Sequence, residues 1–201
     1  MPTKHVIKRY DAPAFYHIYN RASGERSLLR DSDDRAVFLQ LLQKHLAENR
    51  DEESEVKTYL VEVVAYCLMG THFHLLLYQG DVEAISGYMR SVGTSYSMYY
   101  NKKYKSKGHV FQSSFRASHI DSEAYLAHIT RYIHLNPHRY TKWRWSSYRH
   151  YIGLGTTSWV HADRVGVVNQ TDQARYMKFV DDYAAVDLRR QKTELTDYLA
   201  L

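Results

Sequence analysis

The hydrophobic residues of this chain follow two alternating periods, one typical of strands and one typical of helices. Three runs rich in aromatic and β-branched side chains are predicted strands: residues 15–20, 58–66 and 72–78. Between the first two runs, apolar residues recur at steps of three and four and predict a helix. It begins at Asp31 or Ser32, either of which can cap it, and an acidic loop over 48–55 follows it.

The second half of the chain continues this alternation. Apolar positions predict a long helix over about 82–99 and a fourth strand over 108–120. A further helix begins at Asp121 or Ser122 and is ended by Pro137. The order strand, helix, strand, strand, helix, strand, helix predicts an α+β ferredoxin-like sandwich, with an antiparallel sheet and its helices on one face.

The last quarter of the chain is less regular. Tyr176, Phe179 and Tyr183 share one face of a predicted C-terminal helix. We therefore predict a main domain over residues 1–150 and a C-terminal helical extension over 151–201, packed on the domain or trailing it. Residues 189–201 fit either a helix or a tail.

Two histidines flank one hydrophobic residue in the third predicted strand. Successive side chains of a strand point to opposite faces, so His72 and His74 project together and Phe73 projects the other way. Two neighbouring imidazoles on one face are half of a metal site. The alternative is a pair of ordinary half-buried histidines in a sheet.

Tyr132 and Asn136 are four residues apart on a predicted helix and therefore share one of its faces. If that face looks toward His72 and His74, two imidazoles and an amide oxygen would hold a divalent cation with open coordination positions. Tyr132 would stand beside the ion as a nucleophile. Such a site would cleave a phosphodiester and leave a covalent phosphotyrosine. The alternative is that Tyr132 is one more core residue among 19 tyrosines.

Composition limits where the protein works and what it binds. The single cysteine, Cys67, excludes an internal disulfide and a cysteine-based zinc cluster, and favours a reducing compartment, the cytoplasm. We expect neither a secretion signal nor a membrane span, because no apolar segment has the required position or length. The net charge of +5 and the pI near 9.1 favour an anionic partner.

Basic residues and tyrosines alternate between residues 96 and 107. Rings beside cations suit contacts to unpaired bases and to phosphates. The candidate DNA-binding residues are Arg21, Arg90, Lys102, Lys103, Lys105 and Lys107. Solvated surface charge is the alternative for each of them, and the tyrosines can equally belong to a helix packed on the core.

Three segments together carry a family resemblance. They are Thr71-His72-Phe73-His74-Leu75-Leu76, Gly108-His109-Val110-Phe111-Gln112 with Phe115, and Arg131-Tyr132-Ile133-His134-Leu135-Asn136-Pro137. In these segments the chain resembles the IS200-like (Y1) transposase superfamily of HUH endonucleases, and within it the REP-associated tyrosine transposases. The resemblance covers roughly residues 13–185.

The resemblance implies that His72 and His74 are metal ligands, that Asn136 is the third ligand and that Tyr132 is the nucleophile. It implies a metal-dependent endonuclease and strand transferase for single-stranded DNA, acting on hairpins of palindromic repeats. We expect a nucleoid-associated protein that is a monomer rather than a dimer. Ligand softness favours Mn²⁺ and affinity for phosphate oxygens favours Mg²⁺, so either ion is expected as cofactor.

Two residues depart from the family pattern. Thr71 stands where relatives often have Asn, and Ser114 stands where an Arg commonly precedes the phenylalanine of the fourth strand. Arg116 is the candidate replacement for that phosphate contact. Two other functions remain open: a repeat-binding DNA module with lost nuclease activity, which the presence of Tyr132 disfavours, and a relaxase or replication-initiation nuclease, which the motif order and short chain disfavour.

Overall fold

The computed structural model describes residues 10–49, 55–155, 157–166 and 173–184. Its strands are β1 (Ala14–Arg21), β2 (Val61–Leu68), β3 (His72–Gln79) and β4 (Arg116–Ile120). Its helices are α1 (Ser32–Lys44), α2 (Ala84–Lys103), α3 (Glu123–Leu135), α4 (Tyr148–Tyr151) and α5 (Gln173–Ala184). Short 3₁₀ helices lie at Ala47–Asn49, Tyr140–Lys142 and Ala162–Arg164.

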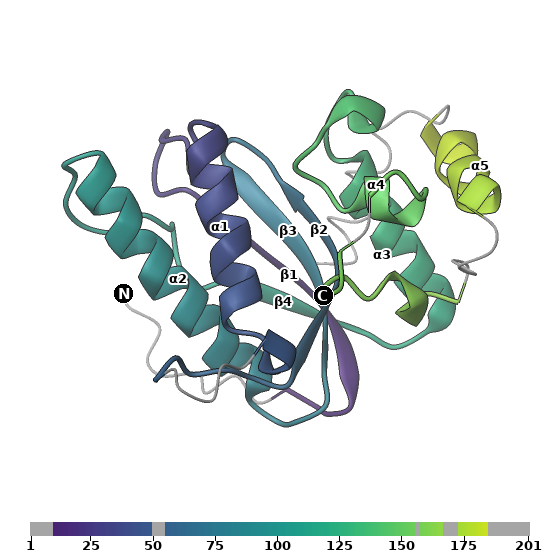
Figure 1. Ribbon diagram of the computed structural model, residues 1–201, viewed down its shortest axis with the longest axis horizontal. Coiled ribbons are helices and arrows are strands. Elements are labelled where there is room, and N and C mark those ends of the chain that lie inside the picture. The colour runs from purple at the N-terminus through teal and green to yellow at the C-terminus, as the bar shows by residue number, and fades with distance from the viewer. Residues whose placement is uncertain (1–9, 50–54, 156, 167–172, 185–201) are drawn as a thin grey trace.

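The four strands form one antiparallel sheet in the order β2-β3-β1-β4. The first strand of the chain therefore lies inside the sheet, between β3 and β4 (Figure 1). Helix α1 connects β1 to β2, and α2 connects β3 to β4. This arrangement is ferredoxin-like and confirms the predicted α+β class.

Helices cover both faces of the sheet, and here the structure differs from the predicted single helical layer. Phe73 of β3 packs on Phe38 of α1, with ring centroids 5.1 Å apart, and Phe38 packs on Tyr96 of α2. The neighbouring His74 instead contacts Tyr132 of α3, at 5.4 Å between centroids. Since adjacent side chains of a strand point to opposite faces, α1 and α2 lie on one face and α3 lies on the other (Figure 1).

The composition of β2 explains the second layer. Its sequence is nearly continuously apolar, and every one of its residues except Glu62 is buried. A strand with apolar residues on both faces needs cover on both. Helix α3 supplies the cover on one face with a buried apolar stripe, Leu126, Ile129 and Ile133.

The fourth strand is shorter than predicted. Only Arg116–Ile120 is paired with β1, and the segment 108–115 is a loop with an isolated bridge between Phe111 and Ala22, the residue that follows β1. The ring of Phe111 packs on Tyr96 and Phe73, so the apolar residues of this loop serve the core without joining the sheet. Helix boundaries match better, because Asp31 and Ser122 cap α1 and α3 as predicted.

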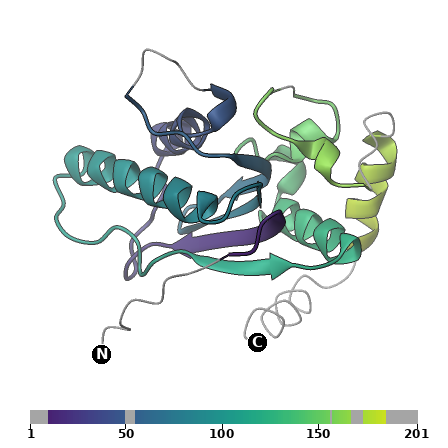
Figure 2. The same cartoon turned by 90° about the horizontal axis from the view of Figure 1, so that it is seen from below.

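Helix α5 packs against α3 through polar contacts as well as apolar ones (Figure 2). The buried ring of His134 bonds through Nδ1 to the hydroxyl of Tyr176, at 2.6 Å, and through Nε2 to Ser147 Oγ, at 2.7 Å. The guanidinium of Arg131 lies 3.6 Å from the ring centre of Tyr183. Residues 189–201, which fit either a helix or a tail, lie outside the described residues.

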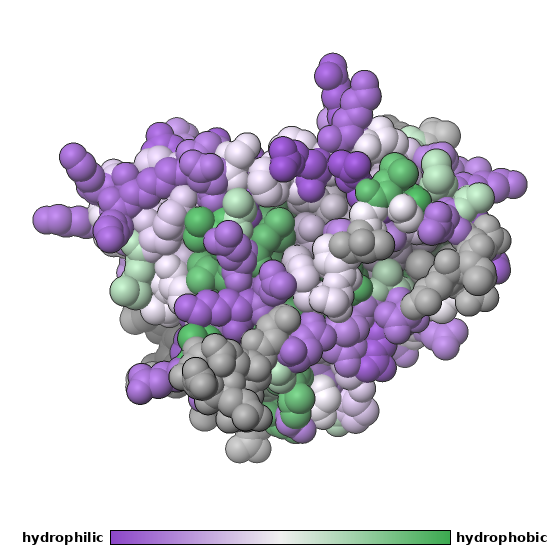
Figure 3. Space-filling model, viewed as in Figure 1, coloured by the Kyte–Doolittle hydropathy of each residue, from purple (hydrophilic) through white to green (hydrophobic). Residues whose placement is uncertain are grey.

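One face of the molecule is largely hydrophilic. Figure 3 shows hydrophilic residues around the rim of the view and hydrophobic residues in smaller areas between them. The large hydrophobic side chains most exposed among the described residues are Leu60, Val82, Met98, Leu154 and Met177. Within the described part of the chain, no helix has the length and apolarity needed to cross a membrane.

Candidate active site

The position of α3 follows from its two ends and its apolar stripe. The hydroxyl of Ser122 accepts a hydrogen bond from the Tyr125 N–H and caps the start of the helix. Pro137 opposes its continuation, and the helix ends at Leu135 with Asn136 as its C-cap. With Ile133 buried against the sheet, the neighbouring face of α3 turns Tyr132 and Asn136 toward β3.

The two histidines project from β3 beside β1. In the sheet, His72 is opposite Arg21 and His74 is opposite Tyr19. The imidazole rings lie 5.1 Å apart and nearly perpendicular, at 81°. His74 is 7% exposed, whereas His72 is partly open to solvent.

The four residues predicted from spacing form one cluster. His72 Nε2 and Asn136 Oδ1 are 3.1 Å apart, and the ring of Tyr132 packs edge-on against His74. Two ring nitrogens, an amide oxygen and a phenol thus meet between β3 and α3. The helix face that carries Tyr132 and Asn136 therefore looks toward His72 and His74, as the predicted chemistry requires.

Each imidazole is also held through its other ring nitrogen. Thr71 Oγ1 lies 2.9 Å from His72 Nδ1, and His17 Nε2 lies 2.9 Å from His74 Nδ1. Metal-binding histidines are commonly fixed in this way, with one nitrogen hydrogen-bonded and the other directed to the ion. His17 has no local sequence signal as a site residue, because it is linked to His74 only by the register between β1 and β3.

Burial sets the protonation of two groups in the cluster. Desolvation lowers the pKa of the fully buried His17 to about 3, so this imidazole is neutral. Burial also raises the pKa of the Tyr132 phenol, and nearby Tyr19 adds to the rise, while a hydrogen bond to Asn136 opposes it. Tyr132 is therefore a protonated phenol that needs assistance to become a nucleophile.

The donor set fits a divalent cation that takes its remaining ligands from elsewhere. No cluster of three or more His, Cys, Asp or Glu residues suited to a metal occurs among the residues that the structure describes. The site instead offers two imidazoles and one amide oxygen. If Nδ1 of His72 donates to Thr71, the lone pairs of His72 Nε2 and Asn136 Oδ1 face each other, an arrangement that a cation between them stabilises.

A small pocket of about 280 Å³ adjoins the two histidines, and we call it the histidine pocket. Arg21 and Arg116 contribute to its wall from β1 and β4. Their strand partners are His72 and Tyr19, so both arginines share the sheet face of the histidines. Arg21 also donates to the side-chain oxygen of Gln112. A phosphate near the cluster would lie within reach of positive charge.

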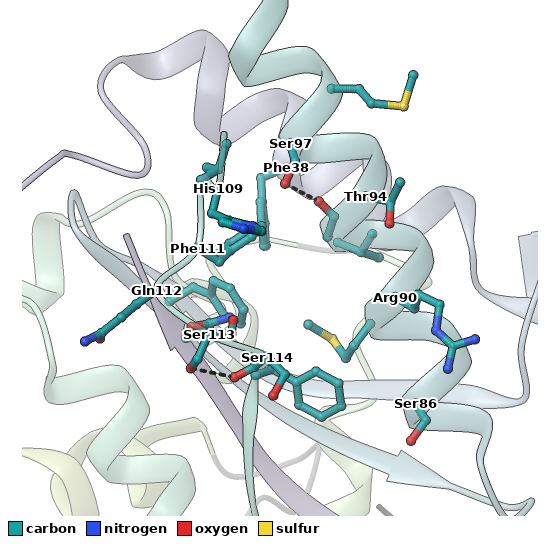
Figure 4. Close-up of a pocket in the computed structure, with 18 of the residues that line it drawn as sticks. Phe38, Ser86, Arg90, Thr94, Ser97, His109, Phe111, Gln112, Ser113 and Ser114 are labelled. Atoms are coloured by element: carbon teal, nitrogen blue, oxygen red, sulfur yellow. Dashed lines mark hydrogen bonds between the residues drawn. The ribbon is translucent and has the colours of Figure 1, made fainter. Parts of the chain in front are cut away.

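A larger groove of about 1010 Å³ lies between α2 and the loop 108–115, and we call it the α2 groove (Figure 4). Ser86, Arg90 and Thr94 line one side, and Phe111 and Gln112 line the other. Gln112 also belongs to the histidine pocket, together with Asn20, Phe73 and Ser113. The two hollows therefore share a wall.

The four predicted DNA-binding lysines differ in their surroundings. Lys102, Lys105 and Lys107 are exposed at and beyond the end of α2. The ammonium of Lys103 instead lies 2.8 Å from carboxylate oxygens of both Asp31 and the buried Asp34. The charge of Lys103 is thus compensated inside the protein, which favours a structural role for it.

Comparisons with known proteins agree with the fold. A family model described as "Transposase IS200 like" matches residues 16–136, more than half of the chain. Among solved structures, the chain is similar to "Structure of the REP associates tyrosine transposase bound to a REP hairpin", with 13% identity and a TM-score of 0.57, over 79% of this chain and 98% of that one. No curated protein matches it. The family match includes all four residues of the cluster.

Proposed function

The chain belongs to the IS200-like transposase family, and we propose that it cleaves and rejoins single-stranded DNA through a covalent phosphotyrosine intermediate. The observation that carries the proposal is the convergence of Tyr132 and Asn136 of α3 with His72 and His74 of β3. A phenol beside two imidazoles and an amide oxygen suits metal-assisted phosphoryl transfer.

Each residue has a role that follows from its position. His72, His74 and Asn136 would hold Mg²⁺ or Mn²⁺, which when bound would offset charge on the scissile phosphate and favour loss of the phenol proton. The Tyr132 oxygen attacks phosphorus as its proton leaves, and the bond from phosphorus to the departing sugar oxygen breaks. That oxygen takes up a proton. The phosphotyrosine keeps the energy of the phosphodiester for the reverse transfer to another strand.

The proposed substrate is single-stranded DNA with a hairpin formed by a palindromic repeat. The similar solved structure is described as bound to a REP hairpin. Arg21 and Arg116 line the histidine pocket and would contact the phosphates next to the scissile bond. Arg90 in the α2 groove would contact DNA farther from the cut. These contacts are electrostatic and should weaken with salt.

One copy of the chain is sufficient for this chemistry. Tyr132, Asn136 and both histidines come from the same chain and already lie together. We therefore propose a monomer as the active unit. A composite site that borrows Tyr132 from a second copy would require α3 to leave the sheet, which would expose Ile129 and Ile133.

The direct test is formation of a covalent adduct. The protein is mixed with a pool of labelled single-stranded oligonucleotides that share a hairpin stem and carry randomised flanking nucleotides, with Mg²⁺ or Mn²⁺. We expect a protein–DNA adduct that survives a denaturing gel, and sequencing of the adducts would give the preferred cleavage site. EDTA should abolish the adduct.

A matched pair of variants assigns the nucleophile. Tyr132→Phe removes one oxygen and should form no adduct, whereas Tyr125→Phe makes the same change two turns earlier on α3 and should leave the yield unchanged. An adduct of normal yield with Tyr132→Phe contradicts the proposal. Hairpin binding without any adduct from the unaltered protein would support a repeat-binding module in its place.

A further inference from the structure

A third histidine lies behind the pair on β3. His17 of β1 is fully buried, and its Nε2 is 2.9 Å from Nδ1 of His74. The two rings are nearly parallel, with centroids 5.1 Å apart and planes at 21°. The rings of His17 and Tyr132 are nearly perpendicular, with centroids 6.0 Å apart. His17 therefore touches a proposed metal ligand and the proposed nucleophile, and it is sealed from solvent.

Packing alone does not account for a histidine at this position. Within the described part of the structure, His17 Nδ1 is buried and has no hydrogen-bond partner. A buried polar atom without a partner costs stability, and an apolar residue of similar size would avoid that cost. The hydrogen bond to His74 is thus the feature that distinguishes His17 from a phenylalanine or a leucine in the same space.

The direction of that hydrogen bond decides what His74 can do. A neutral imidazole carries one N–H, so only one of the two facing nitrogens donates. If His74 Nδ1 donates to His17 Nε2, the lone pair of His74 is on Nε2 and can bind a cation. If His17 donates, Nε2 of His74 carries a proton and cannot.

We infer that His17 is a positioning residue that accepts the Nδ1–H of His74 and thereby presents Nε2 of His74 to the metal ion. The inference rests on the proposed function, because it assumes that His74 is a metal ligand. It assigns to His17 the part that a carboxylate or carbonyl plays behind many metal-binding histidines. The same hydrogen bond also fixes the plane of the His74 ring against Tyr132.

The partner of the other histidine provides a comparison within the same site. Thr71 is exposed, so water can replace its hydroxyl at His72 Nδ1 when the side chain is changed. Water has no such access to the fully buried contact between His17 and His74. Loss of the acceptor at position 17 should therefore weaken metal binding more than loss of the hydroxyl at position 71.

The first test measures Mn²⁺ binding without DNA, by electron paramagnetic resonance of free Mn²⁺. His17→Phe keeps an aromatic ring but removes the acceptor, and we expect its Mn²⁺ affinity to fall by about 10- to 100-fold. His17→Gln offers an amide oxygen as a substitute acceptor and should stay within about threefold of the unaltered protein. Thr71→Val should fall between these two variants. Equal Mn²⁺ affinity of His17→Phe and the unaltered protein would overturn the inference.

The second test needs no variant and therefore does not depend on the folding of His17→Phe. Nitrogen-15 NMR of labelled histidines distinguishes the two tautomers in the unaltered protein with saturating Mg²⁺. We expect His74 to carry its proton on Nδ1. A proton on Nε2 of His74 would overturn the inference while leaving the Tyr132 adduct test unaffected. Absence of any Mn²⁺ binding by the unaltered protein would overturn both the inference and the proposed metal dependence.

Discussion

The histidine pocket and the α2 groove share a wall but are built on opposite principles. In the pocket, His72 and His74 are each fixed by a hydrogen bond at Nδ1 and by the pairing of β3 with β1. In the groove, Arg90 and Thr94 are exposed on a helix, and the facing wall is a loop. The pocket is also the smaller hollow, at about 280 Å³ against about 1010 Å³.

This difference indicates that the pocket serves catalysis and the groove serves DNA binding. Chemistry requires groups held in place before the substrate arrives, which buried strands and paired side chains provide. A DNA strand with a hairpin requires contacts that tolerate different sequences, which exposed polar and basic side chains provide. Changes in the pocket should therefore alter the rate of cleavage, and changes in the groove should alter affinity for DNA.

The largest expected effect is the loss of one imidazole from the pocket. His72→Ala or His74→Ala should lower the single-turnover cleavage rate at saturating DNA and Mg²⁺ by at least about 100-fold, because a metal ligand is lost. His119→Ala is the control, since His119 is exposed on β4 beside Tyr16 and should keep the normal rate. A normal cleavage rate for His72→Ala or His74→Ala would contradict the assignment of catalysis to the pocket.

The pH dependence of the rate tests the burial of Tyr132. Its raised pKa keeps the phenol protonated at neutral pH. The single-turnover rate with Mg²⁺ should rise by up to about tenfold per pH unit above about pH 7, as the phenolate becomes accessible. A rate that is constant from neutral to alkaline pH would show that proton loss from Tyr132 does not limit cleavage.

Sequence alone predicted the members of the four-residue cluster, because each pair depends on local periodicity. His72 and His74 share a strand face, and Tyr132 and Asn136 share a helix face, because both relations follow from backbone geometry. The element order likewise gave the ferredoxin-like sheet. The second helical layer was not predicted. An apolar stripe indicates that one side of α3 is buried, but it does not indicate which face of the sheet α3 packs against.

Relations between distant segments could not be predicted from the sequence. His17 and His74 are 57 residues apart and meet only through the register of β1 and β3. Lys103 looked like its neighbours in a basic run, but its partners Asp31 and Asp34 precede it by about seventy residues. Such partners are set by tertiary packing, for which one sequence carries no local signal.

A smaller effect should separate the arginines of the two regions. Arg116→Ala in the pocket should lower the cleavage rate at saturating DNA by about tenfold, because a phosphate near the cut loses a positive charge. Arg90→Ala in the groove should leave that rate unchanged but weaken DNA binding and reduce its salt dependence by about one counterion. Binding is measured by fluorescence anisotropy at several salt concentrations. If Arg90→Ala instead lowered the cleavage rate and Arg116→Ala affected only DNA binding, the proposed roles of the pocket and the groove would be reversed.

The smallest effect on DNA binding should come from the lysines, and a matched pair on adjacent residues of α2 tests it. Lys103→Met removes the cation paired with the buried Asp34 and should lower the free energy of unfolding by about 2 kcal/mol while leaving DNA affinity nearly unchanged. Lys102→Met removes an exposed charge and should weaken DNA binding by about twofold to threefold without loss of stability. Urea unfolding and anisotropy measure the two quantities. If Lys103→Met instead reduces DNA affinity more than Lys102→Met does, the ion pair with Asp31 and Asp34 opens on binding and Lys103 belongs to the DNA interface.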